Sequence, residues 1–246
     1  MKILVCISKA PDTTAKIAFT NNNTEFDQNG VQFIVNPYDE WYALVRGIEL
    51  KEASGGSVTV INVGGADNDA IIRKALAIGE DDAVRIDAEP TDALAVAKEI
   101  AAFASDKSYD MILTGKETID YNGSHVGAML AELMNCPFIS QASKLDMEGS
   151  NALIERDIQG GKEIIQSPTP FVASCAKGMA EARIPNMRGI MAARTKPLEV
   201  VAAQGASPST SIKWFTIPEA KADCKMIDAE NPEALVEALH QEAKVI

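Results

Sequence analysis

One segment near the middle of the chain, TGKETIDYNGSHVG at residues 114–127, concentrates the residue types that bind ligands or perform catalysis. It follows an apolar run and contains a lysine, two carboxylates, an Asn-Gly pair, a serine and one of the two histidines in the sequence. Glu117, Asp120 and His125 are of the types needed for an acid, a base and an orienting group. Glycines before a helix start are instead suited to holding a phosphate.

The sequence patterns of common catalytic and nucleotide sites are missing. Ser124 stands beside His125, but neighbours in sequence do not make a catalytic triad, and no GxSxG motif is present. The sequence contains no HExxH motif and no other spacing of residues typical of metal ligands. No GxxxxGKS/T phosphate loop occurs, and no GxGxxG follows the first predicted strand. We therefore predict no catalytic residue and no metal site, and we interpret residues 114–127 as a binding segment.

The elements that must position this segment alternate between strand and helix. Apolar runs predict strands at 3–7, 57–64, 82–87, 109–115 and 137–148. Amphipathic stretches predict helices at 66–79, 90–105 and 125–135, and another at 36–56 with Asn36 as its N-cap and Pro37 in its first turn. Two short β pieces flank an Asn-rich turn within 15–36. Regular alternation over about 140 residues predicts an α/β fold with a doubly wound, mostly parallel sheet.

The alternation ends after residue 146. A glycine turn at 159–161 predicts an inserted β-hairpin, and residues 169–176 form a final apolar strand. Residues 177–201 are basic for this protein and irregular, and 202–211 have the composition of a linker. We predict a nucleotide-binding domain at 1–200 and a C-terminal arm at 201–246 that ends in a helix capped by Asn231. That short amphipathic helix must dock on its own domain or on another chain.

Composition limits the classes of partner. The 246 residues carry a formal net charge of -12, which disfavours nucleic acid as a partner. No stretch approaches the roughly 18 apolar residues of a membrane span, so the protein is not expected to be membrane-embedded. The four cysteines form no CxxC pair, and the first residues lack the apolar core of a signal sequence. We expect a reducing, cytoplasmic location.

The predicted topology brings four polar or glycine-rich segments to one edge of the sheet. They are residues 6–9, 36–40, 62–65 and 114–127, each at the carboxyl end of a strand or at a helix start. Ligands of doubly wound sheets bind at this edge, and the helix starts near Asn36 and Gly123 can present N–H groups to phosphate. Any one of these segments is explained as a simple turn. Four together favour a nucleotide or a similar anion.

The sequence resembles the β subunit of electron transfer flavoproteins over residues 1–201. The resemblance rests on Asn36-Pro37 with an acidic residue beyond, IIRKALAIG at 71–79, TGKETID at 114–120 with Val126-Gly127, and RIPNMRGIMAARTKPLEV at 183–200. It implies an adenine-nucleotide α-hydrolase-like fold and an αβ heterodimer that carries electrons. FAD is then held mainly by the α subunit, against which the C-terminal helix is expected to pack, and AMP is a structural ligand of the β subunit.

Carrying the family's AMP contacts over by position assigns the nucleotide to the same four segments. Its phosphate is expected against residues 122–126. The predicted AMP contacts are Cys6, Asn36, Pro37, Tyr38, Asp39, Val63, Gly115, Lys116, Glu117, Thr118, Ile119, Asp120, Tyr121, Asn122, Gly123, Ser124, His125 and Val126.

The resemblance also implies a docking segment. Family members anchor acyl-CoA dehydrogenases, enzymes of fatty acid oxidation, with a leucine that inserts into the partner, and Met187 stands at that position. The predicted docking residues are Arg183, Ile184, Pro185, Asn186, Met187, Arg188, Ile190 and Met191. Arg194 and Lys196 complete a cationic cluster suited to an acidic partner. Ala192 and Thr195 replace lysines that some members methylate. The onward acceptor would be the electron transfer flavoprotein–quinone oxidoreductase, which leads to the respiratory chain.

Three other readings stay open at this point. Electron-bifurcating members bind a second FAD in place of AMP, and they usually carry an acidic residue at position 122 and an arginine at position 116. Asn122 and Lys116 match neither subclass fully, and we favour AMP. An adenine-nucleotide hydrolase or ligase would depend on Asp120 or His125. A sensor that binds AMP or ATP would need no redox partner.

Overall fold

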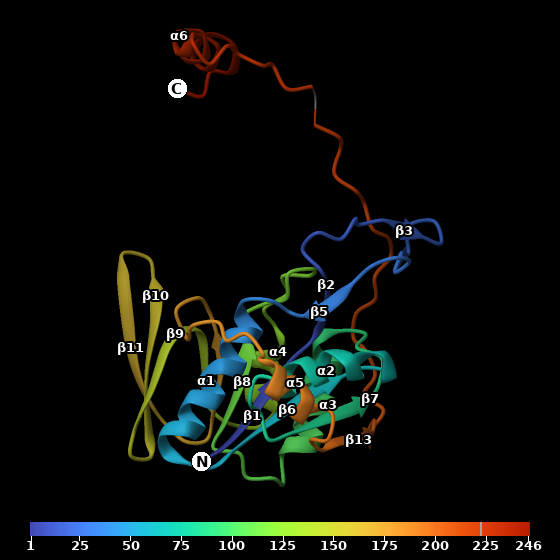
Figure 1. Ribbon diagram of the computed structural model, residues 1–246, viewed down its shortest axis with the longest axis vertical. Helices are drawn as coiled ribbons and strands as arrows, with labels where there is room; N and C mark the ends of the chain where they lie inside the picture. Colours follow the sequence, from blue (N-terminus) through green and yellow to red (C-terminus); the bar gives the residue numbers. More distant parts are fainter. Residues whose placement is uncertain (222) are drawn as a thin grey trace.

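The computed structural model describes residues 1–221 and 223–246. In these residues nine strands form one sheet in the order β11-β10-β9-β12-β8-β1-β6-β7-β13 (Figure 1). The strands are β1 (Lys2–Cys6), β6 (Ser57–Val63), β7 (Asp82–Asp87), β8 (Met111–Gly115), β9 (Phe138–Glu148), β10 (Asn151–Ile158), β11 (Gly161–Pro168), β12 (Phe171–Cys175) and β13 (Leu198–Ala202).

Within the part of the sheet ordered β9-β12-β8-β1-β6-β7-β13, all neighbouring strands pair in parallel. β10 pairs antiparallel with β9 and with β11. The mostly parallel, doubly wound sheet predicted from the sequence is therefore confirmed. β1 lies between β6 and β8. From β1 the chain first adds β6 and β7 on one side and later adds β8 and β12 on the other, so the direction of winding reverses at β1. This is the point at which doubly wound sheets bind ligands.

Helices cover both faces of the sheet. They are α1 (Asp39–Ser54), α2 (Asp69–Leu76) with the 3-10 turn η1 (Ala66–Asn68), α3 (Ala93–Ala104), α4 (Val126–Leu133) and α5 (Met187–Ala193). Buried residues of α1, α2 and α5 belong to one apolar cluster, and those of α3 and α4 belong to another. The sheet therefore separates two hydrophobic cores.

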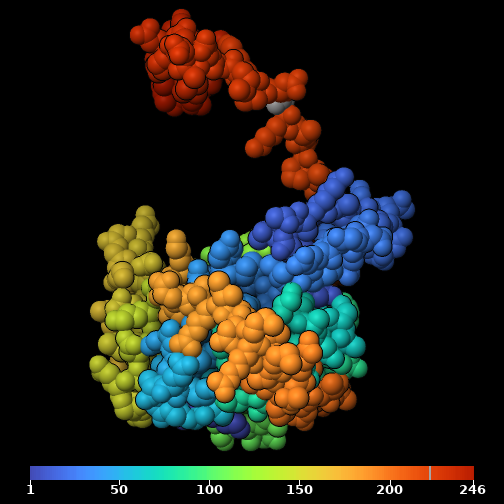
Figure 2. Space-filling view, in the orientation of Figure 1, coloured from blue at the N-terminus to red at the C-terminus, as the bar shows by residue number. Residues whose placement is uncertain are grey.

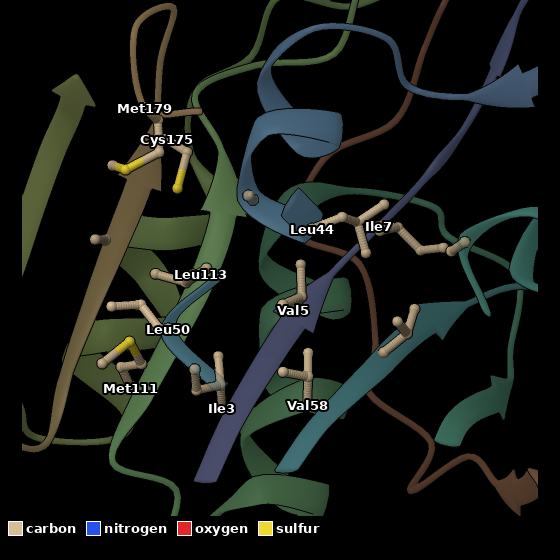
Figure 3. Close-up of a cluster of buried hydrophobic side chains, with 14 of the residues drawn as sticks. Ile3, Val5, Ile7, Leu44, Leu50, Val58, Met111, Leu113, Cys175 and Met179 are labelled. Carbon is tan, nitrogen blue, oxygen red and sulfur yellow. The ribbon is translucent and has the colours of Figure 1, made fainter. Parts of the chain in front are cut away.

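β1 shows why a continuous apolar strand is needed at the centre. Ile3 and Val5 point into the core under α1 and α2, as Figure 3 shows, while Leu4 and Cys6 point into the core under α3 and α4. All four are buried, because successive side chains of a strand face opposite sides and both sides are covered.

The segment between β1 and α1 forms two small ribbons at the edge of the body. β2 (Lys9–Pro11) pairs with β5 (Phe33–Val35), and β3 (Phe19–Thr20) pairs with β4 (Glu25–Phe26). β3 and β4 flank the Asn-rich turn, whereas the second half of the stretch predicted as a hairpin contains β5, which pairs with β2. Phe215 of the C-terminal arm stacks on Phe19, with 4.5 Å between ring centroids.

Two elements after β12, the helix α5 and the strand β13, were not predicted. The predictions that residues 169–176 form the final strand and that 177–201 are irregular are therefore wrong. β13 adds to the edge of the sheet beside β7, and it is largely exposed, so it lacks the continuous apolar run of a buried strand. α5 has only seven residues, too few for a helical period to be recognised, although Asn186 caps it by accepting from the Gly189 N–H at 2.8 Å.

The C-terminal arm begins on the body and then leaves it. The N–H groups of Gln204 and Ala206 donate to the Glu99 carboxylate of α3 at 2.7 and 2.8 Å, so the predicted linker is bound at its start. The arm ends in α6 (Pro232–Glu237) and the π-helical turn η2 (Ala238–Ala243), which stand apart from the body (Figure 1). Asn231 caps α6 as predicted, accepting from the Ala234 N–H at 3.2 Å. The domain boundary at residue 200 falls within β13 and stays a prediction.

None of the helices in the described part of the chain combines the length and the apolar content that crossing a bilayer requires.

Candidate functional site

The loops that follow β1, β6 and β8 lie side by side, because these three strands are neighbours in the sheet. Three of the four predicted segments are therefore brought to one edge by pairing alone. The fourth, residues 36–40, reaches this edge through hydrogen bonds that the sequence does not reveal.

Asn36 joins two of the predicted segments. Its buried side chain donates from Nδ2 to the Glu117 carbonyl at 2.9 Å and accepts at Oδ1 from the Ile119 N–H at 2.9 Å. The prediction that Asn36 caps a helix is wrong, since α1 begins at Asp39 after Tyr38, which has a left-handed φ of 66°. Pro37 consequently lies before the first turn. The amide is used across the two loops and makes no capping bond to α1.

The replacement Asn36→Ala is expected to lower the free energy of unfolding by about 1–3 kcal/mol, because it leaves a partly buried N–H and a partly buried C=O without their partner. Chemical denaturation measures this effect. Asn29→Ala is the matched control, since that exposed amide bonds only within its own turn. Equal stabilities for the two variants would contradict the joining role of Asn36.

Glu40 fixes the start of α1 against the end of β1. The buried carboxylate accepts from the Ser8 N–H at 2.7 Å and from Ser8 Oγ at 2.6 Å. Burial raises the pKa of Glu40 to about 8, against the effect of the two Ser8 bonds. A Cβ on Gly115 would lie 2.7 Å from Glu40 Cγ, so β8 can end here only with glycine. Asp39 and Glu40 both lie in the first turn of α1, so carboxyl groups already occupy the helix start that the sequence offered to an anion.

A second network shapes the loop after β6. Asn62 donates to the Ile7 carbonyl at 2.9 Å and accepts from Asn68 Nδ2 at 2.9 Å. Arg85 of β7 donates to the Gly64 carbonyl at 2.9 Å and pairs with Asp69 and Asp87. A Cβ on Gly64 would collide with the Asn68 amide. The backbone of this loop is therefore held close to the neighbouring side chains.

A cavity of about 260 Å³ opens between the start of α1 and the β8–α4 loop. Two of its lining residues, Tyr42 and Lys177, were not predicted. Lys177 follows β12, a fifth strand end at this edge, within the stretch that the sequence left irregular; its place after an apolar strand was the available signal. The cavity is lined by Pro37, Tyr38, Asp39, Tyr42, Lys116, Glu117, Ile119, Asn122 and Lys177.

The rest of the β8–α4 loop packs on itself. Lys116 Nζ lies 2.9 Å from Glu117 Oε1, and Ser124 Oγ donates to Glu117 Oε2 at 3.3 Å. The Lys116 ammonium lowers the pKa of Glu117. Asn122 and Ser124 adopt left-handed φ values of 48° and 54°. The Glu117 carboxylate is therefore held ionised and paired. A general acid must instead hold a proton.

The other predicted contacts lie around this loop. Cys6 and Val63 are buried at the ends of β1 and β6 and do not line the cavity, and burial raises the pKa of the Cys6 thiol. His125 directly precedes α4 without a side-chain capping bond. Thr118, Asp120, Tyr121 and Gly123 of the loop, and Val126 at the start of α4, likewise do not line the cavity. The described residues contain no cluster of His, Cys, Asp or Glu that could hold a metal ion.

The predicted docking residues gather on and before α5. Ile184, Met187 and Met191 are 90%, 75% and 56% exposed. The predicted cationic cluster is smaller than expected, because Arg183 is paired with Glu52 at 2.9 Å and Lys196 donates to the Leu76 carbonyl at 2.9 Å. The surface available to a partner is therefore mainly apolar.

Comparison with known proteins agrees with the fold. A family model described as "Electron transfer flavoprotein domain" matches residues 24–206. The "Electron transfer flavoprotein subunit beta" of Bacillus subtilis is 34% identical, with 100% of each chain covered. The protein of the same name from Syntrophomonas wolfei is 33% identical over 90% of this chain and 88% of its own. The "Acryloyl-CoA reductase electron transfer subunit gamma" of Anaerotignum propionicum is 28% identical over 98% of each chain.

The mostly parallel sheet is thus that of an electron transfer flavoprotein domain. The chain belongs to the electron transfer flavoprotein family, among its β subunits. Relatives across this family are named as electron transfer subunits, so the chain is an electron-carrier subunit and not an enzyme.

Proposed function

We propose that this chain holds AMP structurally in an αβ electron transfer flavoprotein and docks the dehydrogenases that reduce it. The observation that carries the proposal is the meeting of the loops after β1, β6 and β8 with the start of α1, beside a cavity that contains two lysines.

The residues at this edge fit an adenine nucleotide. Lys177 lines the cavity and supplies positive charge for a phosphate, and Lys116 lines it as well but is paired with Glu117. Left-handed backbone at Asn122 and Ser124 turns the β8–α4 loop just before the start of α4, whose free N–H groups favour an anion. Thr114 Oγ1, at the end of β8 beside Gly127 of α4, is buried without a hydrogen-bond partner among the described residues, so it is left for a ligand or a bridging water.

FAD supplies the redox chemistry of the complex, and we assign it mainly to the α subunit. This chain contributes the nucleotide site, the arm and α6 for the α subunit, and the docking segment. Acyl-CoA dehydrogenases are the proposed donors, because the exposed apolar residues of α5 suit insertion into a partner pocket. The electron transfer flavoprotein–quinone oxidoreductase is the proposed acceptor, from which electrons pass to the respiratory chain.

A second candidate is an electron-bifurcating subunit with FAD in place of AMP. One observation favours it: two cationic side chains line the same cavity, enough to meet a diphosphate as well as a monophosphate. The relative from Anaerotignum propionicum, named as part of an acryloyl-CoA reductase, is consistent with it. We favour AMP because Lys116 is committed to Glu117 by a 2.9 Å ion pair, which leaves one unpaired lysine for the ligand among the described lining residues.

Co-expression with an α subunit tests the proposal. The expected product is a yellow αβ complex that an acyl-CoA dehydrogenase reduces when its substrate is added. A colourless chain that forms no complex with any α subunit would contradict the proposed function.

A further inference from the structure

The docking segment, residues 183–196, is fixed at both ends to the helices beneath it. Figure 2 shows this part of the chain, in orange, spread over the front of the body between the blue α1 region and the teal α2 region. We propose that Arg183 and Arg73 are positioning residues, which hold the segment so that its apolar side chains form a preformed docking surface. This inference rests on the proposed docking function.

The first attachment joins the start of the segment to α1. Arg183 donates from Nη1 and Nη2 to the two carboxylate oxygens of Glu52, each at 2.9 Å, and Glu49 lies 3.9 Å away. A guanidinium paired in this two-pronged way is fixed in orientation as well as in place. Trp41 Nε1 donates to the Arg183 carbonyl at 3.1 Å, so the backbone of Arg183 is bonded to α1 as well as its side chain.

The second attachment joins the end of the segment to α2. Arg73 donates from Nη1 to the Ala193 carbonyl at 2.8 Å and to the Lys196 carbonyl at 2.6 Å. Lys196 returns the contact by donating to the carbonyl of Leu76, the last residue of α2, and to the carbonyl of Glu80 in the loop that follows. Free carbonyls at a helix C-terminus favour a cation, so this contact stabilises both elements.

Between these attachments α5 lies against α2 without side chains to separate their backbones. A Cβ on Gly189 would collide with the Ala77 carbonyl, and Ala193 is buried. One side of the short helix is thereby turned inward, and the other side carries Met187 and Met191 outward. Seven residues cannot form a stable helix without such support.

Preforming a docking surface reduces the ordering that a partner must impose when it binds. Because Arg183 and Lys196 are used internally, they anchor the segment and are not free to attract an acidic partner. The surface they support suits an apolar pocket on the dehydrogenase, with Arg188 and Arg194 near its rim. Loss of an anchor should weaken the complex with the dehydrogenase and leave electron transfer within the formed complex intact.

The test uses the αβ complex as the electron acceptor of an acyl-CoA dehydrogenase. Arg73→Gln and Arg183→Gln are each expected to raise KM for the complex about 5- to 20-fold, with kcat and bound FAD unchanged. Hydrogen exchange at residues 186–195 should become faster. Arg183→Lys, which keeps the charge, should recover part of the loss, and Arg156→Gln is the matched control, since it removes an ion pair on β10 far along the sheet.

Two outcomes separate this inference from the docking function on which it rests. If Met187→Ala raises KM while Arg73→Gln and Arg183→Gln do not, docking stands and the positioning role is wrong. If Met187→Ala also leaves KM unchanged, the docking function itself is wrong. Faster exchange in the arginine variants with an unchanged KM would likewise overturn the positioning role.

Discussion

An αβ complex carrying Met187→Glu is expected to accept electrons from its dehydrogenase about 100-fold less efficiently, measured as kcat/KM. Met187 is 75% exposed on α5 and is available to enter a partner pocket. Burying a methionine contributes about 1.5–3 kcal/mol, and a carboxylate in the same pocket adds a desolvation cost. Since about 1.4 kcal/mol corresponds to a factor of ten, the combined loss reaches about two powers of ten.

The matched control for this change is Ile164→Glu. Ile164 is also exposed, at 64%, but it lies on β11 at the far edge of the sheet. Its replacement should leave kcat/KM within about twofold of the unchanged complex. The proposed docking role of α5 fails if the two variants behave alike, or if Met187→Glu retains full efficiency.

The stability of the protein is expected to fall as pH rises from about 5 to 8, and Glu80→Gln should remove about half of that fall, because Glu40 has a similarly raised pKa and contributes the other part. Glu80 is fully buried, and neither carboxylate oxygen has a hydrogen-bond partner among the described residues. Burial raises its pKa from the ordinary value of 4.5 to about 8, against the nearby Lys196 charge. Between these values the folded chain holds a proton that the unfolded chain releases, so stability decreases with pH.

The free energy of unfolding of the Glu80→Gln variant, relative to that of the unchanged protein, is expected to rise by roughly 2–4 kcal/mol between pH 5 and pH 8.5. Urea denaturation over this range measures it. Glu163→Gln is the control, because that residue pairs with Arg156 at the surface of the hairpin. A constant difference between variant and unchanged protein at all pH values would show that Glu80 keeps an ordinary pKa in the fold.

The parts of the fold that the sequence predicts are those buried on both sides. β1, β6 and β8 are continuous apolar runs because helices cover both faces of the sheet, and the amphipathic helices between them complete the pattern. β13 and α5 escape prediction for the opposite reason. One is an exposed edge strand and the other a single short helix, so their positions depend on β7, Arg73 and Ala77, which are distant in sequence.

The candidate site divides in the same way. Strand ends can be read from the sequence, so the loops after β1, β6 and β8 are predicted to meet. The hydrogen-bond and ion-pair partners of each polar side chain cannot be predicted from the sequence. Asn36 looks like a helix cap but joins two loops, and Arg183 looks like a free surface cation but is an internal anchor. Lys177 becomes a candidate contact only when β12 is placed beside β8.

The nucleotide content of the αβ complex tests the central proposal most directly. Native mass spectrometry, followed by denaturation and chromatography of the released small molecules, counts each nucleotide per heterodimer. The account predicts one FAD and one AMP. Two FAD molecules per heterodimer would assign the cavity between α1 and the β8–α4 loop to a bifurcating flavin, and FAD with no second adenine nucleotide would contradict the proposed nucleotide site.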